Sequence, residues 1–210
     1  NTVSLSRPLI IEKFRRLGVT EAVAEQVFSA GSAMASYIQR QKAGARVHVL
    51  GQQGTKDEIA AAGLEVVEEE AEFVAIGIDR DVQFDQLKRA CRLALKGAEL
   101  VAANPDRWFP EEDGPVPGAG CFKAFVEWCT GREAVMVGKP NPEIFRQACG
   151  FIGVDPARVL MIGDNAEVDL GGARATGMRC VLVGGHHGDA GADGVVEHLA
   201  ELHELLAAGD

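Results

Sequence analysis

The chain has 210 residues, of which 47% are hydrophobic and 25% are charged, and its 21 Lys and Arg against 31 Asp and Glu give a formal net charge of −10. This composition is typical of a globular protein with one full core and room for a smaller second domain. It excludes a disulfide-stabilised mini-protein. The acidic balance, without any run of Lys and Arg, argues against a nucleic-acid-binding or membrane-surface-binding protein.

The cysteines and the apolar runs indicate where the protein resides. Five scattered cysteines form no CxxC pair, so we predict reduced thiols, no zinc site and a cytoplasmic location. The apolar runs are only a few residues long, far below the ~18 residues of a membrane helix. The chain begins at Asn1 rather than Met and shows no signal peptide, which leads us to expect a missing upstream segment.

Apolar spacing and capping residues predict alternating helices and strands in the first half of the chain. The expected elements are helices over about 7–17 and 32–42, a strand over 46–50, a helix begun by a Thr55/Glu58 capping box and ended by Gly63, strands over 64–67 and 73–78, a helix capped by Asp85, and a strand over 100–103. Residues 44–104 are therefore expected to form a small α/β unit.

The stretch 104–120 is rich in Pro and Gly and predicts a linker at a domain boundary. After it we expect a helix with Phe122 and Phe125 in the core, strands over 134–137, 159–162 and 180–183, and helices over 142–149 and up to about 176. Continuous apolar strands that alternate with helices predict a parallel, doubly wound sheet, buried on both faces.

Polar residues follow two of these strands, at the sheet edge where ligands bind in parallel sheets. Lys139 comes after the strand over 134–137, whereas Asp164 follows the strand over 159–162 and Asp169 lies five residues further on. Taken alone, Asp164 is equally well explained as a helix cap, and Lys139 is better explained as a surface residue. Together they predict a cation beside a hard-oxygen metal site suited to Mg²⁺.

These segments resemble a known family. VGKPNPEIF (137–145) and VLMIGDNAEVDLGGARATGM (159–178) are similar to motifs III and IV of the haloacid dehalogenase (HAD) superfamily. VAANPDRWFPEEDGPVPGAG (101–120) and NTVSLSR (1–7) resemble its subfamily IIA, the NagD-like and 4-nitrophenylphosphatase-like enzymes with a C2-type cap. The resemblance implies a HAD Rossmann-like, doubly wound parallel-sheet core over 1–43 and 119–210, with an inserted α/β cap over 44–118.

The resemblance also implies a Mg²⁺-dependent phosphatase that acts on a small phosphorylated metabolite through an aspartyl-phosphate intermediate. Lys139 matches the catalytic lysine of motif III, Asp164 the metal ligand of motif IV, and Asp169 its second acid near the metal. The expected phosphate-binding and substrate-binding residues are Asn1, Thr2, Asn104, Asp106, Lys139 and Asn165. A homodimer is common among such look-alikes, although no residue here demonstrates one.

One part of the family pattern is missing from this sequence. The nucleophile motif DxDG precedes motif II in the family, and we expect it upstream of Asn1. Asp79-Arg80-Asp81 imitates the motif but stands in the wrong order and lacks the following Gly, so we predict no catalytic role for it. His186-His187 predicts a loop rather than a metal site. The alternatives are a catalytically silent HAD-like binding or scaffold subunit, a dehalogenase of the same superfamily, and a phosphomutase.

Overall fold

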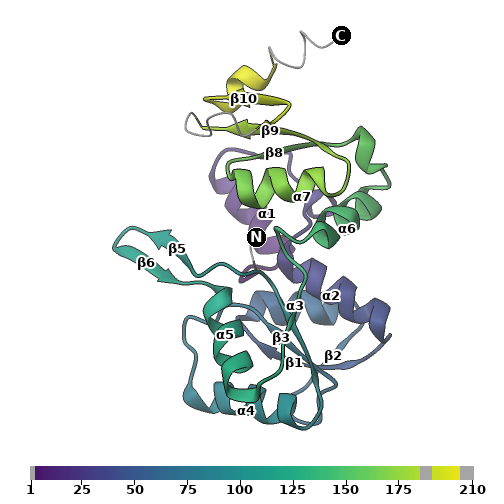
Figure 1. Cartoon of the computed structure of the whole chain (residues 1–210), viewed down its shortest axis with the longest axis vertical. Helices are drawn as coiled ribbons and strands as arrows, with labels where there is room; N and C mark the ends of the chain where they lie inside the picture. Colours follow the sequence, from purple (N-terminus) through teal and green to yellow (C-terminus); the bar gives the residue numbers. More distant parts are fainter. Residues whose placement is uncertain (1–2, 185–190, 204–210) are drawn as a thin grey trace. The chain divides into compact units, whose positions relative to one another are not determined.

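The computed structural model describes residues 3–184 and 191–203 (Figure 1). The chain divides into two compact units, Asn1–Gly138 and Lys139–Asp210, and each contains a parallel sheet. All five cysteines are free thiols. Within the described ranges, no helix combines the length and the apolar character needed to span a bilayer.

The sheet of the first unit has five strands in the order β2-β1-β3-β4-β7, all paired in parallel. The strands are β1 (Arg46–Leu50), β2 (Glu65–Val66), β3 (Phe73–Ile76), β4 (Glu99–Ala102) and β7 (Val135–Met136). The chain goes from β1 to β2 on one side and then returns past β1 to β3 and β4 on the other. The strand order therefore reverses between β1 and β3, which makes this the topological switch point of the sheet.

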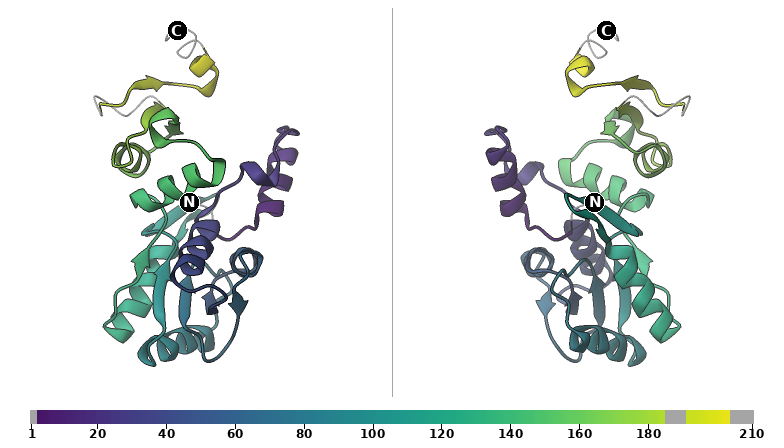
Figure 2. Two further views of the ribbon diagram at one scale, coloured as in Figure 1. Left: turned by 90° about the vertical axis from the view of Figure 1, so that its right-hand side faces the viewer. Right: turned by 90° about the vertical axis from the view of Figure 1, so that its left-hand side faces the viewer.

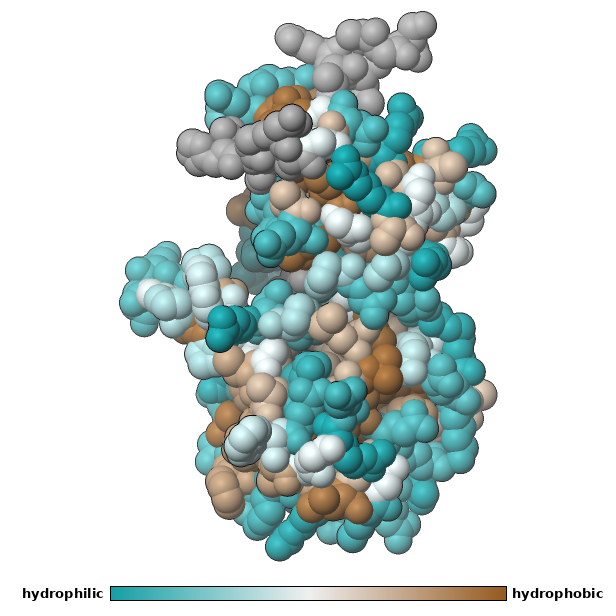
Figure 3. Space-filling model, in the orientation of Figure 1, coloured by the Kyte–Doolittle hydropathy of each residue, from teal (hydrophilic) through white to brown (hydrophobic). Residues whose placement is uncertain are grey.

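Helices lie on both sides of this sheet (Figure 2): α2 (Ala30–Gln41) and α3 (Gln53–Ala61) on one face, and α4 (Phe84–Leu95) and α5 (Ala119–Thr130) on the other. Helix α1 (Arg7–Arg16) contacts the 3₁₀ turn η1 (Ala24–Gln26) and helix α3. Helix α2 packs against α3, and α4 packs against α5. Buried apolar residues of β3, β4, α4 and α5 form one core cluster, which includes Val74, Leu93, Leu100 and Val126. On the surface drawn in Figure 3, hydrophobic residues of this unit gather in separate groups among hydrophilic ones.

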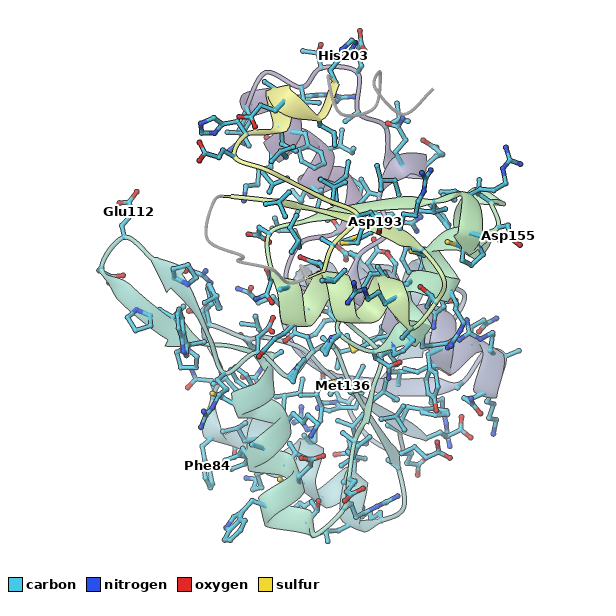
Figure 4. The ribbon with its side chains drawn as sticks, turned by 45° about the horizontal axis from the view of Figure 1, so that its top comes forward. Phe84, Glu112, Met136, Asp155, Asp193 and His203 are labelled. Atoms are coloured by element: carbon cyan, nitrogen blue, oxygen red, sulfur yellow. The ribbon has the colours of Figure 1, made fainter. Side chains whose placement is uncertain are left out.

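The Pro-rich stretch is not the simple linker that the sequence predicts. Strands β5 (Trp108–Glu111) and β6 (Gly114–Pro117) pair as an antiparallel hairpin with Glu112 at its tip (Figure 4). A two-stranded ribbon has an outward edge on each strand, so it accommodates prolines that lack an N–H donor. Two paired strands therefore lie where the sequence predicts a linker, and the domain boundary expected there stays a prediction.

The second unit contains a three-stranded parallel sheet in the order β10-β9-β8. Its elements are α6 (Pro142–Ile152), the 3₁₀ turn η2 (Pro156–Arg158), β8 (Leu160–Gly163), the π-helical turn η3 (Ala166–Leu170), α7 (Gly171–Arg174), β9 (Arg179–Val183), β10 (Gly194–Val196) and the 3₁₀ turn η4 (Leu199–Glu201). Within the described residues β8 is an edge strand, and Ile162 on it is 37% exposed. The expected burial of this strand on both faces is therefore wrong.

The α/β class with parallel sheets is confirmed, and the expected elements are present with boundaries shifted by a few residues. Two capping predictions fail. Helix α3 begins before Thr55, so Thr55 and Glu58 lie inside the helix. Helix α4 is capped by Gln83 rather than Asp85, which occupies its first turn. Phe125 is 42% exposed and is not a core residue.

The packing of the segment 119–138 differs from the sequence-based division. Helix α5 contacts α4, β3 and β4, and β7 pairs with β4, so this segment belongs to the first compact unit. The sequence alone predicts that the same segment belongs to the core domain. The domain boundaries expected there, 1–43 with 119–210 and 44–118, remain a prediction.

Candidate active site

Lys139 and Asp169 form a close ion pair within the second unit. The Lys139 Nζ atom lies 2.6 Å from Asp169 Oδ1, and the side chains are 24% and 2% exposed, respectively. A charge-assisted hydrogen bond in such a partly buried setting is short and strong. The ammonium group of Lys139 is therefore held at a fixed position.

The second oxygen of Asp169 fixes the loop that follows β8. Asp169 Oδ2 accepts hydrogen bonds from the backbone N–H groups of Asp164 and Asn165, both at 3.2 Å. A Cβ atom on Gly163 would lie 2.4 Å from Asp169 Cγ, so only glycine leaves room for the carboxylate. The π-helical turn η3 brings Asp169 back to this loop, and such turns are frequent at functional sites. One buried carboxylate thus orients both Lys139 and the Asp164 loop.

The structure separates the roles of Asp164 and Asn165. Asn165 Oδ1 accepts hydrogen bonds from the backbone N–H groups of Glu167 and Val168, both at 3.0 Å, and is the N-cap of η3. The alternative explanation of Asp164 as the helix cap is therefore wrong. Asp164 is exposed, and its position after a strand of a parallel sheet suits a carboxylate that meets a ligand.

The acids of this site fit part of a Mg²⁺ shell. Within the described residues, no three His, Cys, Asp or Glu side chains come close enough together to form a metal cage. Mg²⁺ usually keeps several waters and is bound by one or two carboxylates together with substrate phosphate. Asp164 suits direct ligation because it is exposed. Asp169 suits an orienting role, since its oxygens already accept three hydrogen bonds.

Asn104 and Asp106, the expected substrate contacts of the first unit, shape the base of the hairpin. Asn104 is 2% exposed, and its Oδ1 atom accepts a hydrogen bond of 3.1 Å from the Asp106 N–H. The Asp106 carbonyl accepts one of 2.9 Å from the Gly120 N–H. These contacts are those of a turn around Pro105, so a substrate-binding role for either residue remains a prediction. Asn1 and Thr2, which are expected to bind phosphate, and His186-His187, which is expected to form a loop, lie outside the described residues.

The segment Asp79-Arg80-Asp81 stabilises loops of the first unit through hydrogen bonds and an ion pair. Asp79 is buried and accepts hydrogen bonds from the Asp81 N–H at 3.0 Å and from Gln86 Nε2 at 2.9 Å. Arg80 pairs with Glu111 on the hairpin and stacks over the Phe109 ring, 5.3 Å from its centroid. These contacts favour a structural role for the segment.

Sequence reasoning missed the importance of Gly163 and the double role of Asp169. The signal was a glycine directly before the loop acid, at the end of an apolar strand. A third omission is the buried Glu58 of the first unit, whose carboxylate accepts hydrogen bonds from Arg7 and Ser32. No local pattern indicates those partners.

The fold and the site together define a Rossmann-like α/β protein whose lysine and acidic loop suit a phosphorylated ligand. The model of the haloacid dehalogenase-like hydrolase family matches residues 1–177. The chain belongs to this family.

Two individual relatives show which proteins of the family the chain is similar to. The chain is 36% identical over 162 residues to the 5'-nucleotidase YutF of Bacillus subtilis (strain 168), covering 77% of this chain and 63% of that protein. It is 37% identical over 194 residues to chronophin of Mus musculus, covering 87% of this chain and 66% of that protein. It therefore spans less than two thirds of either relative.

A solved structure supports the same placement. The p-nitrophenyl phosphatase from Archaeoglobus fulgidus matches with a TM-score of 0.90 and 35% identity, covering 97% of this chain and 83% of that one. The resemblance to the 4-nitrophenylphosphatase-like members of the family is thereby confirmed.

Proposed function

We propose that the protein is a Mg²⁺-dependent phosphatase that hydrolyses small phosphomonoesters. The observation that carries this proposal is the 2.6 Å contact between Lys139 and the buried Asp169, whose other oxygen holds the loop bearing Asp164. The names of the relatives, a 5'-nucleotidase and a p-nitrophenyl phosphatase, support the same class of substrate.

Lys139 would stabilise the phosphoryl group during transfer. An ammonium group donates to phosphoryl oxygens as negative charge spreads over them. Because Asp169 holds Lys139 in place before the substrate arrives, little reorganisation is needed when that charge develops. Lys139 is therefore the catalytic residue that this geometry supports best.

Asp164 would hold the metal ion, with Asp169 orienting its loop. When bound, Mg²⁺ would neutralise charge on the phosphoryl oxygens and so favour in-line displacement of the leaving alcohol at phosphorus. We also propose an aspartate nucleophile on a strand upstream of Asn1, which would attack phosphorus as the ester P–O bond breaks and the alcohol leaves, forming an aspartyl-phosphate that water then hydrolyses to phosphate. Asn1 and Thr2 would donate hydrogen bonds to the phosphoryl oxygens, and a cytoplasmic location belongs to the same proposal.

Phosphate release from 4-nitrophenyl phosphate by the purified full-length protein tests the proposal. We expect Lys139→Ala and Asp164→Asn to lower kcat by about a hundredfold or more. The matched control is Asp155→Asn, which changes an exposed acid of the same unit (Figure 4) whose side chain caps η2 through the Ala157 N–H at 2.9 Å. Asparagine can cap in the same way, so kcat of the control stays at the wild-type value.

Further activity and binding assays of the full-length protein distinguish the alternative functions. Full activity in both site variants would contradict the site assignment. Metal-independent chloride release from a 2-chloro acid would identify a dehalogenase. Conversion of a sugar phosphate into its positional isomer would identify a phosphomutase. Binding of phosphate without turnover of any phosphomonoester would identify a silent binding subunit.

A further inference from the structure

Two thiol groups meet where helices α4 and α5 of the first unit pack against each other (Figure 1). Cys91 on α4 is 5% exposed and belongs to the core cluster, whereas Cys129 on α5 is exposed. The two thiol groups lie within hydrogen-bond distance of each other. Both helices belong to the same compact unit, so this contact lies wholly inside the first unit.

The packing of the two helices explains why these thiols face each other. On α4, Ala90, Cys91 and Ala94 are buried within one turn. On α5, the buried Val126 precedes Cys129 by three residues, and residues three apart lie on the same face of a helix. Small alanine side chains let two helices approach closely, and a disulfide needs Cα atoms within about 7 Å of each other. The packing therefore favours a covalent link at this contact.

The two thiols differ in reactivity. Burial, together with the neighbouring Cys129 thiol, raises the pKa of Cys91 to about 12, so Cys91 stays protonated near neutral pH. Oxidants react with exposed thiolates, and a second thiol beside the oxidised sulfur resolves the product. Cys129 is thus the thiol that an oxidant reaches first, and Cys91 is placed to react next.

We propose that Cys91 and Cys129 form a redox-responsive pair, which hydrogen peroxide oxidises to a disulfide that joins α4 to α5 without disturbing their packing. The free thiols of the structure are the reduced state of this pair. Disulfides inside cells are mostly transient and redox-sensing, which agrees with the reduced thiols that the sequence predicts. The inference is independent of the proposed phosphatase function.

The oxidation proceeds in two steps. The Cys129 thiolate attacks one oxygen of hydrogen peroxide, the O–O bond breaks and hydroxide leaves, so that Cys129 becomes a sulfenic acid. The Cys91 sulfur then attacks the Cys129 sulfur. An S–S bond forms, the S–O bond breaks, and the oxygen leaves as water with the proton of Cys91. Two thiols and one hydrogen peroxide thus give one disulfide and two waters.

Peptide mass spectrometry of the full-length protein detects this disulfide. The protein is treated with hydrogen peroxide, its remaining thiols are alkylated with iodoacetamide in urea, and the chain is cut with trypsin. We expect the tryptic peptides 90–92 and 124–132 to be cross-linked, and dithiothreitol to separate them. Cys129→Ser should abolish the cross-link. Cys121→Ser, the matched control, changes another exposed thiol of α5 and should leave the cross-link at the wild-type level.

Amide hydrogen exchange in the same proteins tests whether the disulfide fits the packing. A disulfide restricts the unfolded chain and thereby stabilises the folded one. We expect exchange at the buried residues 73–76 of β3 to be about thirtyfold slower or more after oxidation of the wild type and of Cys121→Ser. Exchange in Cys129→Ser should not change on oxidation.

Three outcomes would overturn the inference. Oxidation of Cys129 to a sulfinic or sulfonic acid, with Cys91 left as a thiol, would refute the pairing. A disulfide that joins two copies of the chain, seen as a doubled mass in non-reducing electrophoresis, would refute the link between α4 and α5. A cross-link within one chain that leaves exchange in β3 unchanged or faster would refute the fit of the disulfide to the existing packing.

Discussion

Replacement of Asp169 by Asn is the sharpest perturbation of the candidate active site. Asp169 is 2% exposed and accepts hydrogen bonds from Lys139 Nζ at 2.6 Å and from the N–H groups of Asp164 and Asn165 at 3.2 Å. Asparagine has nearly the same shape but no charge. Its amide group also offers only one oxygen to these donors, which lie on both sides of the carboxylate.

The expected loss of stability follows from the burial of the pair. Removal of one partner from a buried ion pair costs about 3–5 kcal/mol, because the other charge stays behind without compensation. The Lys139 side chain is 24% exposed, so water screens part of the remaining charge. We therefore expect the lower end, a loss of about 3 kcal/mol in the free energy of unfolding of the second unit.

The assay must report on the second unit. Trp108 and Trp128 are the only tryptophans of the sequence and both lie in the first unit, so their fluorescence would not detect the change. Amide hydrogen exchange at the buried residues 180–182 of β9 detects unfolding of the second unit. A loss of about 3 kcal/mol accelerates global-opening exchange roughly a hundredfold.

A double variant provides the internal control for Asp169→Asn. Lys139→Met together with Asp169→Asn leaves no unpaired charge, so we expect it to recover at least about 1 kcal/mol relative to Asp169→Asn alone. A loss below about 1 kcal/mol in Asp169→Asn, or a double variant as unstable as the sum of the single ones, would refute this reasoning.

Three further predictions follow from particular sites. Gly163→Ala should disrupt the site, since its Cβ atom would lie 2.4 Å from a buried carboxyl carbon, whereas at Gly150 in α6 an added Cβ meets nothing within 4 Å. Gly150→Ala should therefore raise the free energy of unfolding by about 0.5–1 kcal/mol, and a lower free energy of unfolding in this variant would contradict the prediction. Burial, together with the Cys129 thiol, raises the pKa of Cys91 to about 12, so iodoacetamide at about pH 8 should alkylate Cys129 well before Cys91 in peptide mass spectra; equal rates would be inconsistent with the structure. Burial is the main cause that lowers the pKa of His48 below its ordinary value of 6.5. Because the unfolded chain then binds this proton more readily than the folded one, the free energy of unfolding falls as the pH drops below 6.5, and urea titrations of His48→Gln should show a shallower fall.

The parts of the structure that local sequence rules govern could be predicted. Continuous apolar runs indicated parallel strands, although β8 is not buried on both faces. Polar residues after two of these strands marked Lys139 and Asp164 as candidate site residues, and that assignment stays a prediction. The spacing of Asp164 and Asp169 also marked the acidic loop. These signals depend on residues close together in the sequence, which is why a single chain suffices to see them.

The remaining features depend on partners far apart in the sequence. Thr55 and Glu58 have the spacing of a capping box, yet Thr55 bonds to Val3 and Glu58 to Arg7, separations of 52 and 51 residues. Tertiary hydrogen bonds overrode the local pattern. Likewise, the prolines of 104–120 favoured a linker. The hairpin could not be foreseen, because no local rule shows that two short strands will pair with each other outside the main sheet.

Asp164 and Lys139 would, in our proposal, belong to a Mg²⁺-dependent phosphatase site. The most direct test measures phosphate release from 4-nitrophenyl phosphate by full-length wild-type protein and by Asp164→Asn, each with excess Mg²⁺ and after chelation. We expect release by the wild type that chelation abolishes and added Mg²⁺ restores, with kcat of Asp164→Asn lower by about a hundredfold or more even with Mg²⁺ present. Equal release by both proteins, or none by the wild type with Mg²⁺ present, would contradict the proposal.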